Sequence, residues 1–486
     1  MLLLVTLALA APDDDVARAA ATRQVLDDGI DAFTGLAPES DARAVWQLGG
    51  CEDASDWVKD LLSATCARDV TSRRPSWELR PTASVDVGNL SPTNVSGDEA
   101  PGWFGPRVGA RGVVYAGPMV LRAAPSVGLD VAPGVTPTVR VPELWMGYDS
   151  GKGWFGVGQQ DRWMGPGEHG SLLLSDNAVA PWMLNGGLDG HFPGWARHLG
   201  RFRVEMGVGV LAEPRTDVPL PGLLLMDFRW LPVPELEIGV NRLSIFGGEG
   251  RPAVDFSQLL LPTEPHVSDD PDKLLADQDE LATVNIKVNA PLHRWLGGPF
   301  GHLSGWWEYG GEDMIVRKLG DVPYPALAGV ANLYGGELSM GPVVATGEYA
   351  RLMDDAFRWY VGHRVYHEGF TQDGQVMGHF GGPDSETASG QLSVWGKGWR
   401  ARGWGDWTRR VGVIDTANGK VYTLQNEERR YRGGLGLDLD VHGLWLSGGY
   451  TYGQTENANF TDRRDTVEHR FVLALASGPA LRSAPR

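Results

Sequence analysis

The chain has 486 residues, more than one ordinary soluble domain holds, and no linker-like segment divides it into two. Its formal net charge of −18 argues against nucleic acid as a partner, because the phosphates would be repelled. The longest apolar run, residues 1–12, is well short of the roughly 20 residues that a membrane helix needs, which excludes helical spans. Abundant glycine (66 residues), tryptophan (19) and tyrosine (12) are typical of a barrel with glycine-containing strands and aromatic girdles.

The N-terminus resembles a secretory signal. An apolar run over residues 2–10 ends in an Ala-x-Ala pattern, and Pro12 with three aspartates comes directly after it. The run has no basic residue before it, so a truncated start is one interpretation of its beginning. An apolar first helix is the alternative, but Pro12 and the aspartates would break it. We therefore predict an exported chain with a signal peptide over residues 1–11.

Residues 12–74 show helical periodicity. Apolar residues recur at three- and four-residue spacing, and glycines and Pro38 divide the segment into short helices. It has too little apolar surface to fold well alone, so we expect a helical region that packs against the rest of the chain. The residues that carry the period are Val25, Leu26, Ile30, Phe33, Trp57, Leu61 and Leu62.

Both cysteines of the chain, Cys51 and Cys66, fall in this early segment. In an exported protein they could close a disulfide loop of about 15 residues, which contributes about 3 kcal/mol in the entropic model. Two unpaired buried thiols are the alternative, and the sequence leaves both open. No Cys/His cluster has zinc spacing, so we expect neither a structural metal nor a cofactor.

From Trp77 onward the period changes to two. Apolar and polar residues alternate over roughly 400 residues, as in strands with one apolar and one polar face. Charged residues such as Arg203, Glu205 and Lys287 occupy the polar positions. A soluble sandwich is one explanation, but an apolar-out, polar-in membrane barrel fits better, because closure removes the many unpaired strand edges. We predict an all-β outer-membrane barrel over residues 75–486 that closes with the strand Phe471 to Leu475.

Several separated motifs resemble those of the Wzi-type outer-membrane capsule-assembly family, in the family's order. The central one is Asp161-Arg162-Trp163-x-Gly165-Pro166, followed by Ser171-Leu-Leu-Leu-Ser175-x-Asn177-Ala178. The others are residues 25–30 with 45–48, residues 238–242 with 247–252, residues 311–313, and residues 367–369 with 378–379 and 384–389.

The resemblance implies an 18-stranded outer-membrane barrel with an N-terminal periplasmic helical bundle. It further implies a surface lectin that holds capsular polysaccharide to the cell. The chain length agrees, since residues 77–477 leave roughly 22 residues for each strand and its connection, enough for tilted strands of about 10.

Two places carry the residue types that bind sugars, namely aromatic faces beside planar polar groups. Asp161, Arg162 and Trp163 stand together before a forced turn, and Trp399 lies beside Arg400 and Arg402. For the first set, lumen ion pairing is the alternative interpretation; for the second, it is an interfacial aromatic girdle. Further charged residues are expected to form a polar network in the lumen that fixes loops, namely Arg203, Glu205, Glu249, Arg251, Glu312, Asp313, Asp384 and Glu386.

The favoured function is non-covalent retention of capsular or other surface polysaccharide by a monomeric barrel in the lipid of the outer membrane. A solute channel is the second hypothesis. A hydrolase is the third and least favoured, because no Gly-x-Ser-x-Gly, His-Glu-x-x-His or P-loop pattern occurs. The adjacent carboxylates Glu312 and Asp313 would point to opposite faces of a strand, so they make a poor acid/base pair.

Overall fold

The computed structural model describes residues 76–89, 104–131, 135–150, 152–252, 278–319, 322–328, 331–353, 358–396, 398–416, 419–441, 444–477 and 481–482. The predicted signal peptide (1–11), the helical region (12–74), Cys51 and Cys66 lie outside the described residues. Within the described part of the chain, no helix is long and apolar enough to cross a membrane.

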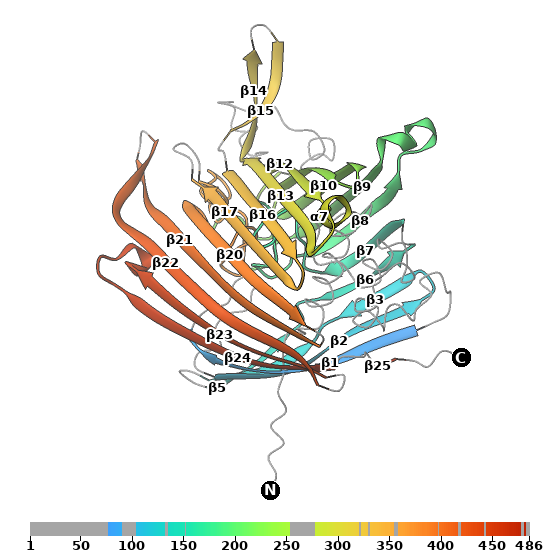
Figure 1. The fold of residues 1–486 in the computed structure, drawn as a ribbon. Coiled ribbons are helices and arrows are strands. Elements are labelled where there is room, and N and C mark those ends of the chain that lie inside the picture. Colours follow the sequence, from blue (N-terminus) through green and yellow to red (C-terminus); the bar gives the residue numbers. More distant parts are fainter. Residues whose placement is uncertain are drawn as a thin grey trace.

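The described chain forms one closed antiparallel barrel of 18 strands, the number that the resemblance implied. Figure 1 shows how the strands are arranged around the barrel. Two wall strands are each interrupted, so that β3 with β4 and β5 with β6 count once each. The wall strands are β1 (Ser76–Gly88), β2 (Phe104–Ala116), β3 (Met119–Ala123), β4 (Ser126–Val131), β5 (Val135–Arg140), β6 (Leu144–Asp149), β7 (Gly153–Gln159), β8 (Trp182–His191), β9 (Arg201–Val210), β10 (Gly222–Val233), β11 (Leu236–Phe246), β12 (Asp279–Ala290), β13 (Phe300–Gly311), β16 (Ala331–Met340), β17 (Val343–Leu352), β20 (Ser385–Gly396), β21 (Trp399–Thr416), β22 (Gly419–Val441), β23 (Leu444–Glu456) and β24 (Thr466–Ser477).

Several short elements lie outside this count. The hairpin of β14 and β15 projects at the top of Figure 1, beyond β13 and β16. The bounds of the remaining elements are β14 (Asp313–Leu319), β15 (Val322–Ala328), β18 (Thr371–Gln372), β19 (Gln375–Val376), β25 (Leu481–Arg482), η1 (Gly194–Leu199), α7 (Leu292–Leu296) and η2 (Ala458–Phe460).

The first and last wall strands close the barrel. β24 pairs with β1 in antiparallel register, from Thr82 opposite Ala476 to Gly88 opposite Arg470. The predicted closing strand, Phe471 to Leu475, is therefore confirmed. After it the chain continues as β25, which pairs with β1 at Glu78 and Leu79.

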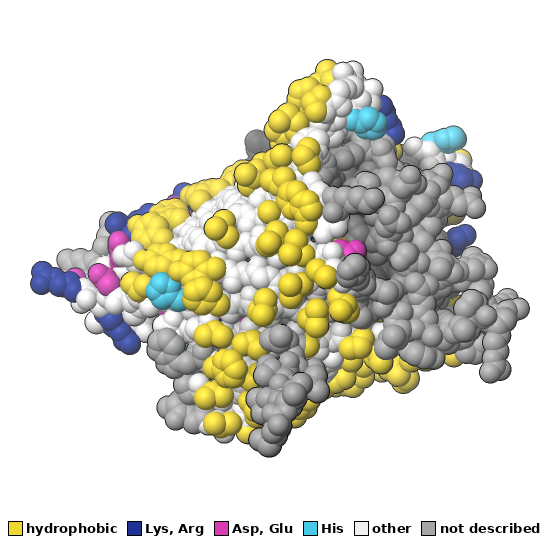
Figure 2. Space-filling view, turned by 60° about the horizontal axis from the view of Figure 1, so that its bottom comes forward, with side chains coloured by type: hydrophobic (Ala, Val, Ile, Leu, Met, Phe, Trp, Pro, Cys, Tyr) yellow, Lys and Arg dark blue, Asp and Glu magenta, His cyan; other side chains and the backbone are white. Residues whose placement is uncertain are grey.

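The alternation predicted from the sequence holds in the strands. In β12, Thr283, Asn285 and Lys287 are buried on the inner face, whereas Val284 and Val288 are exposed on the outer face. Hydrophobic side chains cover much of the outer face that Figure 2 presents, and the Lys and Arg side chains visible there lie at its edges. An apolar outer band with polar residues inside is the arrangement that a lipid-embedded barrel requires.

The two ends of the barrel differ in their connections. Strands join by short turns at one end, for example at residues 117–118, 234–235 and 341–342. The opposite end carries the long connections 160–181, 211–221 and 353–384 and the β14–β15 hairpin. Outer-membrane barrels have short periplasmic turns and longer extracellular loops, so we call these the periplasmic and extracellular ends.

Candidate functional site

The first inward loop, residues 160–181, folds into the lumen from the extracellular end. Its run Leu172-Leu173-Leu174 is buried against inward-facing apolar residues of the wall, such as Leu223 and Leu281. In a solvated loop, three consecutive leucines would expose apolar surface to water. Burial of each side chain instead stabilises the inward conformation by about 1.5–3 kcal/mol.

Two wall carboxylates hold the backbone of this loop. Glu348 of β17 accepts hydrogen bonds from the N–H groups of Glu168 (2.5 Å) and His169 (2.9 Å) and from Nε1 of Trp306 (3.0 Å). Glu308 of β13 accepts a hydrogen bond from the N–H of Leu172 (3.1 Å). These two side chains accept hydrogen bonds from N–H groups that have no partner within the loop itself, so the wall fixes the loop in place.

The second inward loop, residues 353–384, packs on the first. Tyr360 donates its hydroxyl proton to the Leu172 carbonyl (2.8 Å) and accepts a hydrogen bond from the N–H of His379 (2.7 Å). Ser175 donates to the Gly378 carbonyl (2.7 Å). A Cβ atom built on Gly170 would lie 2.2 Å from Cδ2 of His379, so only glycine allows this close approach.

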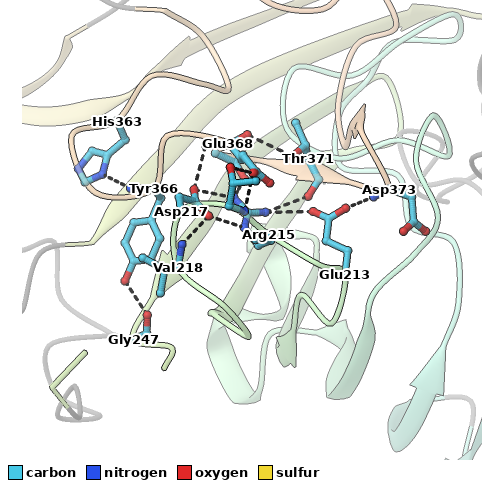
Figure 3. Close-up of polar contacts among 12 residues, drawn as sticks. Glu213, Arg215, Asp217, Val218, Gly247, His363, Tyr366, Glu368, Thr371 and Asp373 are labelled. Atoms are coloured by element: carbon cyan, nitrogen blue, oxygen red, sulfur yellow. Dashed lines mark hydrogen bonds and ion pairs between the residues drawn. The ribbon is translucent and has the colours of Figure 1, made fainter. Parts of the chain in front are cut away.

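A third loop, residues 211–221, is fastened to the second by Arg215. Figure 3 shows this side chain among Glu213, Asp217, Glu368 and Thr371. Arg215 forms ion pairs with Glu213 (3.1 Å) and Asp217 (3.0 Å), and it also donates to the carbonyls of Gly369 (3.0 Å) and Thr371 (3.3 Å). One buried guanidinium therefore joins two loops that are about 150 residues apart in sequence.

The two carboxyls beside Arg215 differ in their pKa. Burial raises the pKa of Glu213, and the hydrogen bond from the Asp373 N–H only partly offsets that effect. Burial acts in the same direction on Asp217, but hydrogen bonds from Arg215 and from the N–H groups of Glu368 and Val218 outweigh it and hold its pKa below the usual value. Asp217 is thus the main counter-ion of Arg215.

The three inward loops and the facing wall share one hydrophobic core, and we call the three loops together the plug. Aromatic residues of the second loop complete this core. The wall residues that reach it come from β8 to β17, so the plug lies against that side of the barrel. Its largest members are Met164, Leu172, Leu173, Leu211, Trp306, Trp359, Tyr360, Tyr366 and Phe370.

Asp161, Arg162 and Trp163, predicted as ligand contacts, lie in the plug. Arg162 forms an ion pair with Glu205 of β9 (3.1 Å), and Nε1 of Trp163 donates to the Gly167 carbonyl (2.9 Å). Trp163 is buried, and Asp161 is half-buried beside it. These partners are the ones that the alternative interpretation, ion pairing within the lumen, describes.

Trp399 and Arg400, the other predicted ligand contacts, lie on opposite faces of β21. Trp399 is exposed on the outer face, at a barrel edge where an aromatic girdle belongs. Arg400 is buried inside, with its guanidinium over the Trp395 ring, and pairs with Asp438 (2.8 Å). Arg402 also faces inward, 3.9 Å from Asp438. Trp399 therefore cannot form one surface with these two arginines.

The residues predicted for the lumen network lie in three different places. Arg203 lies in the lumen and pairs with Glu205 (3.5 Å). Asp384 pairs with Arg358 (2.7 Å) at the end of the second inward loop. Arg251, Glu312 and Asp313 lie at the extracellular end, with Glu312 buried after β13 and Asp313 in the β14 hairpin.

Two residues of that prediction lie elsewhere. Glu249 is exposed in the turn after β11 rather than in the lumen. Glu386 points outward from β20, because its neighbours Ser385 and Thr387 take the inward positions. It pairs there with Arg409 (3.2 Å) and Arg351 (3.7 Å). The alternation of side chains in β20 explains why Glu386 is not in the lumen, because a strand residue between two inward-facing neighbours faces outward.

Several residues that shape the site had no motif to mark them. Glu308 and Glu348 are two of many carboxylates in the strands, and the sequence does not distinguish them from the others. Arg229 lies in an ordinary alternating strand, where it is fully buried and pairs with Asp227 (3.0 Å) and Glu237 (3.1 Å). One feature of the sequence does indicate the plug. Leu223-Leu224-Leu225 in β10 is apolar on both faces, which predicts that something apolar covers the inner face as well as the outer.

The opposite side of the lumen, β20 to β24, carries charged residues on its inner face, and the second inward loop reaches it at Phe380. Arg432 pairs with Asp406 (2.8 Å), and its guanidinium lies 5.2 Å from the centre of the Phe380 ring. Arg410 pairs with Glu428 (3.2 Å) and lies over the ring of Phe460. These residues and Arg430 lie side by side toward the extracellular end, next to Phe380 of the second inward loop, and we call this region the mouth.

Comparison with known proteins agrees with this architecture. Residues 107–298 match the family model described as capsule assembly protein Wzi. A Klebsiella pneumoniae protein described as an uncharacterized 55.8 kDa protein in the cps region is 31% identical over 103 residues. That match spans 20% of this chain and 20% of the relative's length.

The solved structure of Wzi from Escherichia coli, described as a carbohydrate-binding β-barrel of the outer membrane involved in group 1 capsule assembly, has a similar fold. The TM-score is 0.70 at 16% identity, with 95% of this chain and 98% of that chain covered. The protein is thus an outer-membrane β-barrel. The resemblance inferred from the motifs is confirmed by this match of residues 107–298 to the Wzi capsule assembly family.

Proposed function

We propose that this protein binds capsular or other surface polysaccharide at the outer face of the membrane and retains it there. The observation that carries the proposal is the plug. It packs into the lumen against β8 to β17 with a hydrogen-bonded core, which supports a fixed surface for an external polymer rather than an open pore.

The chemistry of the mouth supports a sugar ligand. Phe460 is half-buried and offers an aromatic face that can cover the C–H surface of a pyranose ring, and the planar guanidinium of Arg410 stands beside it. Phe380 is buried, with its ring against His379 and Arg432, and helps to hold that arginine in position. Arginine forks and carboxylates can bind paired hydroxyl groups from the same side. The ion pairs already in place hold these groups in position before a ligand arrives, which lowers the entropic cost of binding.

The relatives support the same ligand class. The E. coli Wzi structure is described as carbohydrate-binding, and the K. pneumoniae protein is described as lying in a cps region. We further propose that the protein acts without catalysis, as a monomer in outer-membrane lipid, and that residues 12–74 form a periplasmic helical region. The absence of hydrolase motifs in the sequence supports the first of these.

The test is deletion of the protein in its own cell, with cell-bound and medium polysaccharide measured together. We expect polysaccharide to move from the cell to the medium while the total stays constant, and wild-type protein supplied in trans to restore the cell-bound fraction. Polysaccharide that stays cell-bound at its normal level would sink the proposal.

Planar-bilayer recording separates retention from the channel hypothesis. Because the plug packs against the wall over its whole core, the purified wild-type barrel is expected to show no steady openings. Steady single-channel conductance from the wild-type protein would instead favour solute transport.

A further inference from the structure

One edge of the Arg430 guanidinium makes no hydrogen bond within the protein. Its Nε and Nη2 atoms are buried and have no acceptor. The charge of Glu468 on β24 acts on Arg430, but neither of these two atoms bonds to it. Arg430 faces the lumen from β22, because it pairs in register with Thr408 and Thr455, which are both buried on the inner face. Leaving a buried charged donor without an acceptor is costly, so such a group in a folded protein calls for an explanation.

The arginines on either side of Arg430 already have partners. Arg410 forms its ion pair with Glu428, and Arg432 forms its pair with Asp406. The second oxygen of Glu428 accepts a hydrogen bond of 2.7 Å from a backbone N–H of the β23–β24 connection. The carboxylates of Glu428 and Asp406 are thus engaged elsewhere, and Arg430 presents two unused donors to the mouth.

The identity of the two unpaired atoms limits the class of ligand that can bind here. Nε and Nη2 form the side of a guanidinium that donates two parallel hydrogen bonds, and the group that accepts two parallel bonds is a carboxylate or a phosphate. Among surface polysaccharides the carboxylated sugars bring such a group on a pyranose ring. Phe460, half-buried beside Arg410 of the arginine cluster, supplies an apolar face for that ring.

We propose that Arg430 is the carboxylate-binding residue of the mouth and that the retained polysaccharide contains a uronic acid or another carboxylated sugar. This rests on the proposed function and names the ligand class for it. The protein's net charge of −18 makes a local positive group necessary, because an acidic polymer is repelled by the rest of the surface.

The connection between β23 and β24 forms one side of this site and is conformationally strained. Asn457, Asn459, Phe460 and Arg463 all have left-handed φ angles, between 52° and 58°, although none is glycine. Asparagine adopts this region readily, but Phe460 and Arg463 persist there only where their surroundings enforce it, as is common at ligand sites. Rearrangement of this connection offers the route by which a carboxylate reaches the shielded edge of Arg430.

The experiment uses the full-length protein in detergent and the purified surface polysaccharide of its own cell. A second preparation of that polymer has its carboxyl groups chemically reduced to alcohols, and affinity for both is measured by titration calorimetry. Arg430→Gln removes the charge. Arg429→Gln is the matched control, because the adjacent side chain points to the outer face and pairs there with Glu427.

We expect Arg430→Gln to weaken binding of the native polymer about tenfold or more, as for loss of a charged hydrogen-bond pair, and Arg429→Gln to change it less than twofold. Carboxyl reduction should weaken wild-type binding by a similar factor and leave the affinity of Arg430→Gln unchanged. If that variant does not fold, the comparison of the two polymers on the wild-type protein still decides the question.

Three results would overturn the inference while leaving the retention function intact: equal wild-type affinity for both polymers, wild-type affinity in Arg430→Gln, or a polymer without carboxyl groups. A wild-type protein that binds neither polymer would instead count against the proposed function itself.

Discussion

The two sides of the lumen use their inward-facing polar side chains differently. On β8 to β17, the inner face is covered by the plug, and its carboxylates Glu308 and Glu348 bind loop backbone. On β20 to β24, the inner face keeps its arginines and acids facing the mouth. The first side uses its polar groups to hold the plug, whereas on the second side one edge of the Arg430 guanidinium makes no hydrogen bond within the protein. Rigidity on one side therefore provides a fixed boundary for a binding surface on the other.

The largest expected effect is on the stability of the side that carries the plug, through its buried arginine, Arg229. Arg229→Leu removes the partner of both Asp227 and Glu237 and leaves two buried carboxylates without their cation. We expect a loss of about 3–5 kcal/mol in the free energy of unfolding, measured by urea titration in detergent micelles. Arg294→Leu, in the exposed periplasmic turn α7, is the control and should change it by less than about 0.5 kcal/mol. Equal loss in both variants would contradict the structural role of Arg229.

The plug itself can be released from the wall. Glu348→Ala leaves three buried donors without an acceptor, namely the N–H groups of Glu168 and His169 and Nε1 of Trp306. We expect docking of the plug to weaken by about 1.5–3 kcal/mol in total, because water can reach the loop N–H groups once they leave the wall, and hence transient openings in planar bilayers that the wild type lacks. Tyr349→Phe, at the next position on the outer face, should stay closed. Closed behaviour in both variants would mean that Glu348 does not hold the plug.

Acid is expected to loosen the plug through His379. Burial, with the positive charges of Arg430 and Arg432 and the nearby His169, lowers the pKa of His379 to about 3. Because the unfolded histidine has a pKa near 6.5, the folded plug is fully favoured above that pH and loses stability as the pH falls toward about 3. Each pH unit in this window changes the open-to-closed ratio by about tenfold, which proteolysis of residues 353–384 would report. In His379→Asn that slope should become shallower, and an unchanged slope would assign the effect to other groups.

The smallest expected effect concerns the contact between the two main loops. Ser175→Ala removes the hydroxyl that donates to the Gly378 carbonyl and accepts from the N–H of Asn177 (3.1 Å). We expect a loss of about 1 kcal/mol, seen as faster hydrogen exchange in residues 371–379. The hydroxyl of Ser150, at the opposite, periplasmic end, bonds only within its own turn, so Ser150→Ala should leave that exchange unchanged. Protection that survives Ser175→Ala would show that apolar packing alone joins the loops.

The barrel could be predicted from the sequence because its rule is local. In strands such as β9 and β12, each residue's face follows from its neighbours, so inner and outer positions could be assigned one strand at a time. The closing strand was found the same way, and the family motifs supplied the number of strands. Phe471 and Leu473 are exposed outward in β24, as that alternation requires.

The site could not be predicted, because its contacts are not local. The Glu168 to Glu348 bond joins residues 180 positions apart, and no periodicity marks a carboxylate whose partner is a loop N–H. Trp399 and Arg400 looked like one surface because they are adjacent in sequence, yet adjacent strand residues face opposite sides. The same alternation, applied to Arg429 and Arg430, now separates a control position from a candidate ligand contact.

The long sequence separations across the plug also set an order of assembly. The first inward loop, residues 160–181, is synthesised well before β13 and β17, whose carboxylates hold it, and before the second loop that covers it. Contacts of such high sequence separation form late, because the entropy of closing the intervening chain must be overcome first. The pairing of β24 with β1 joins residues that are farther apart still, 384 positions in the Arg470–Asp86 pair. The same argument therefore places the docking of the plug before closure of the wall, so that the last strand seals a barrel whose lumen is already occupied.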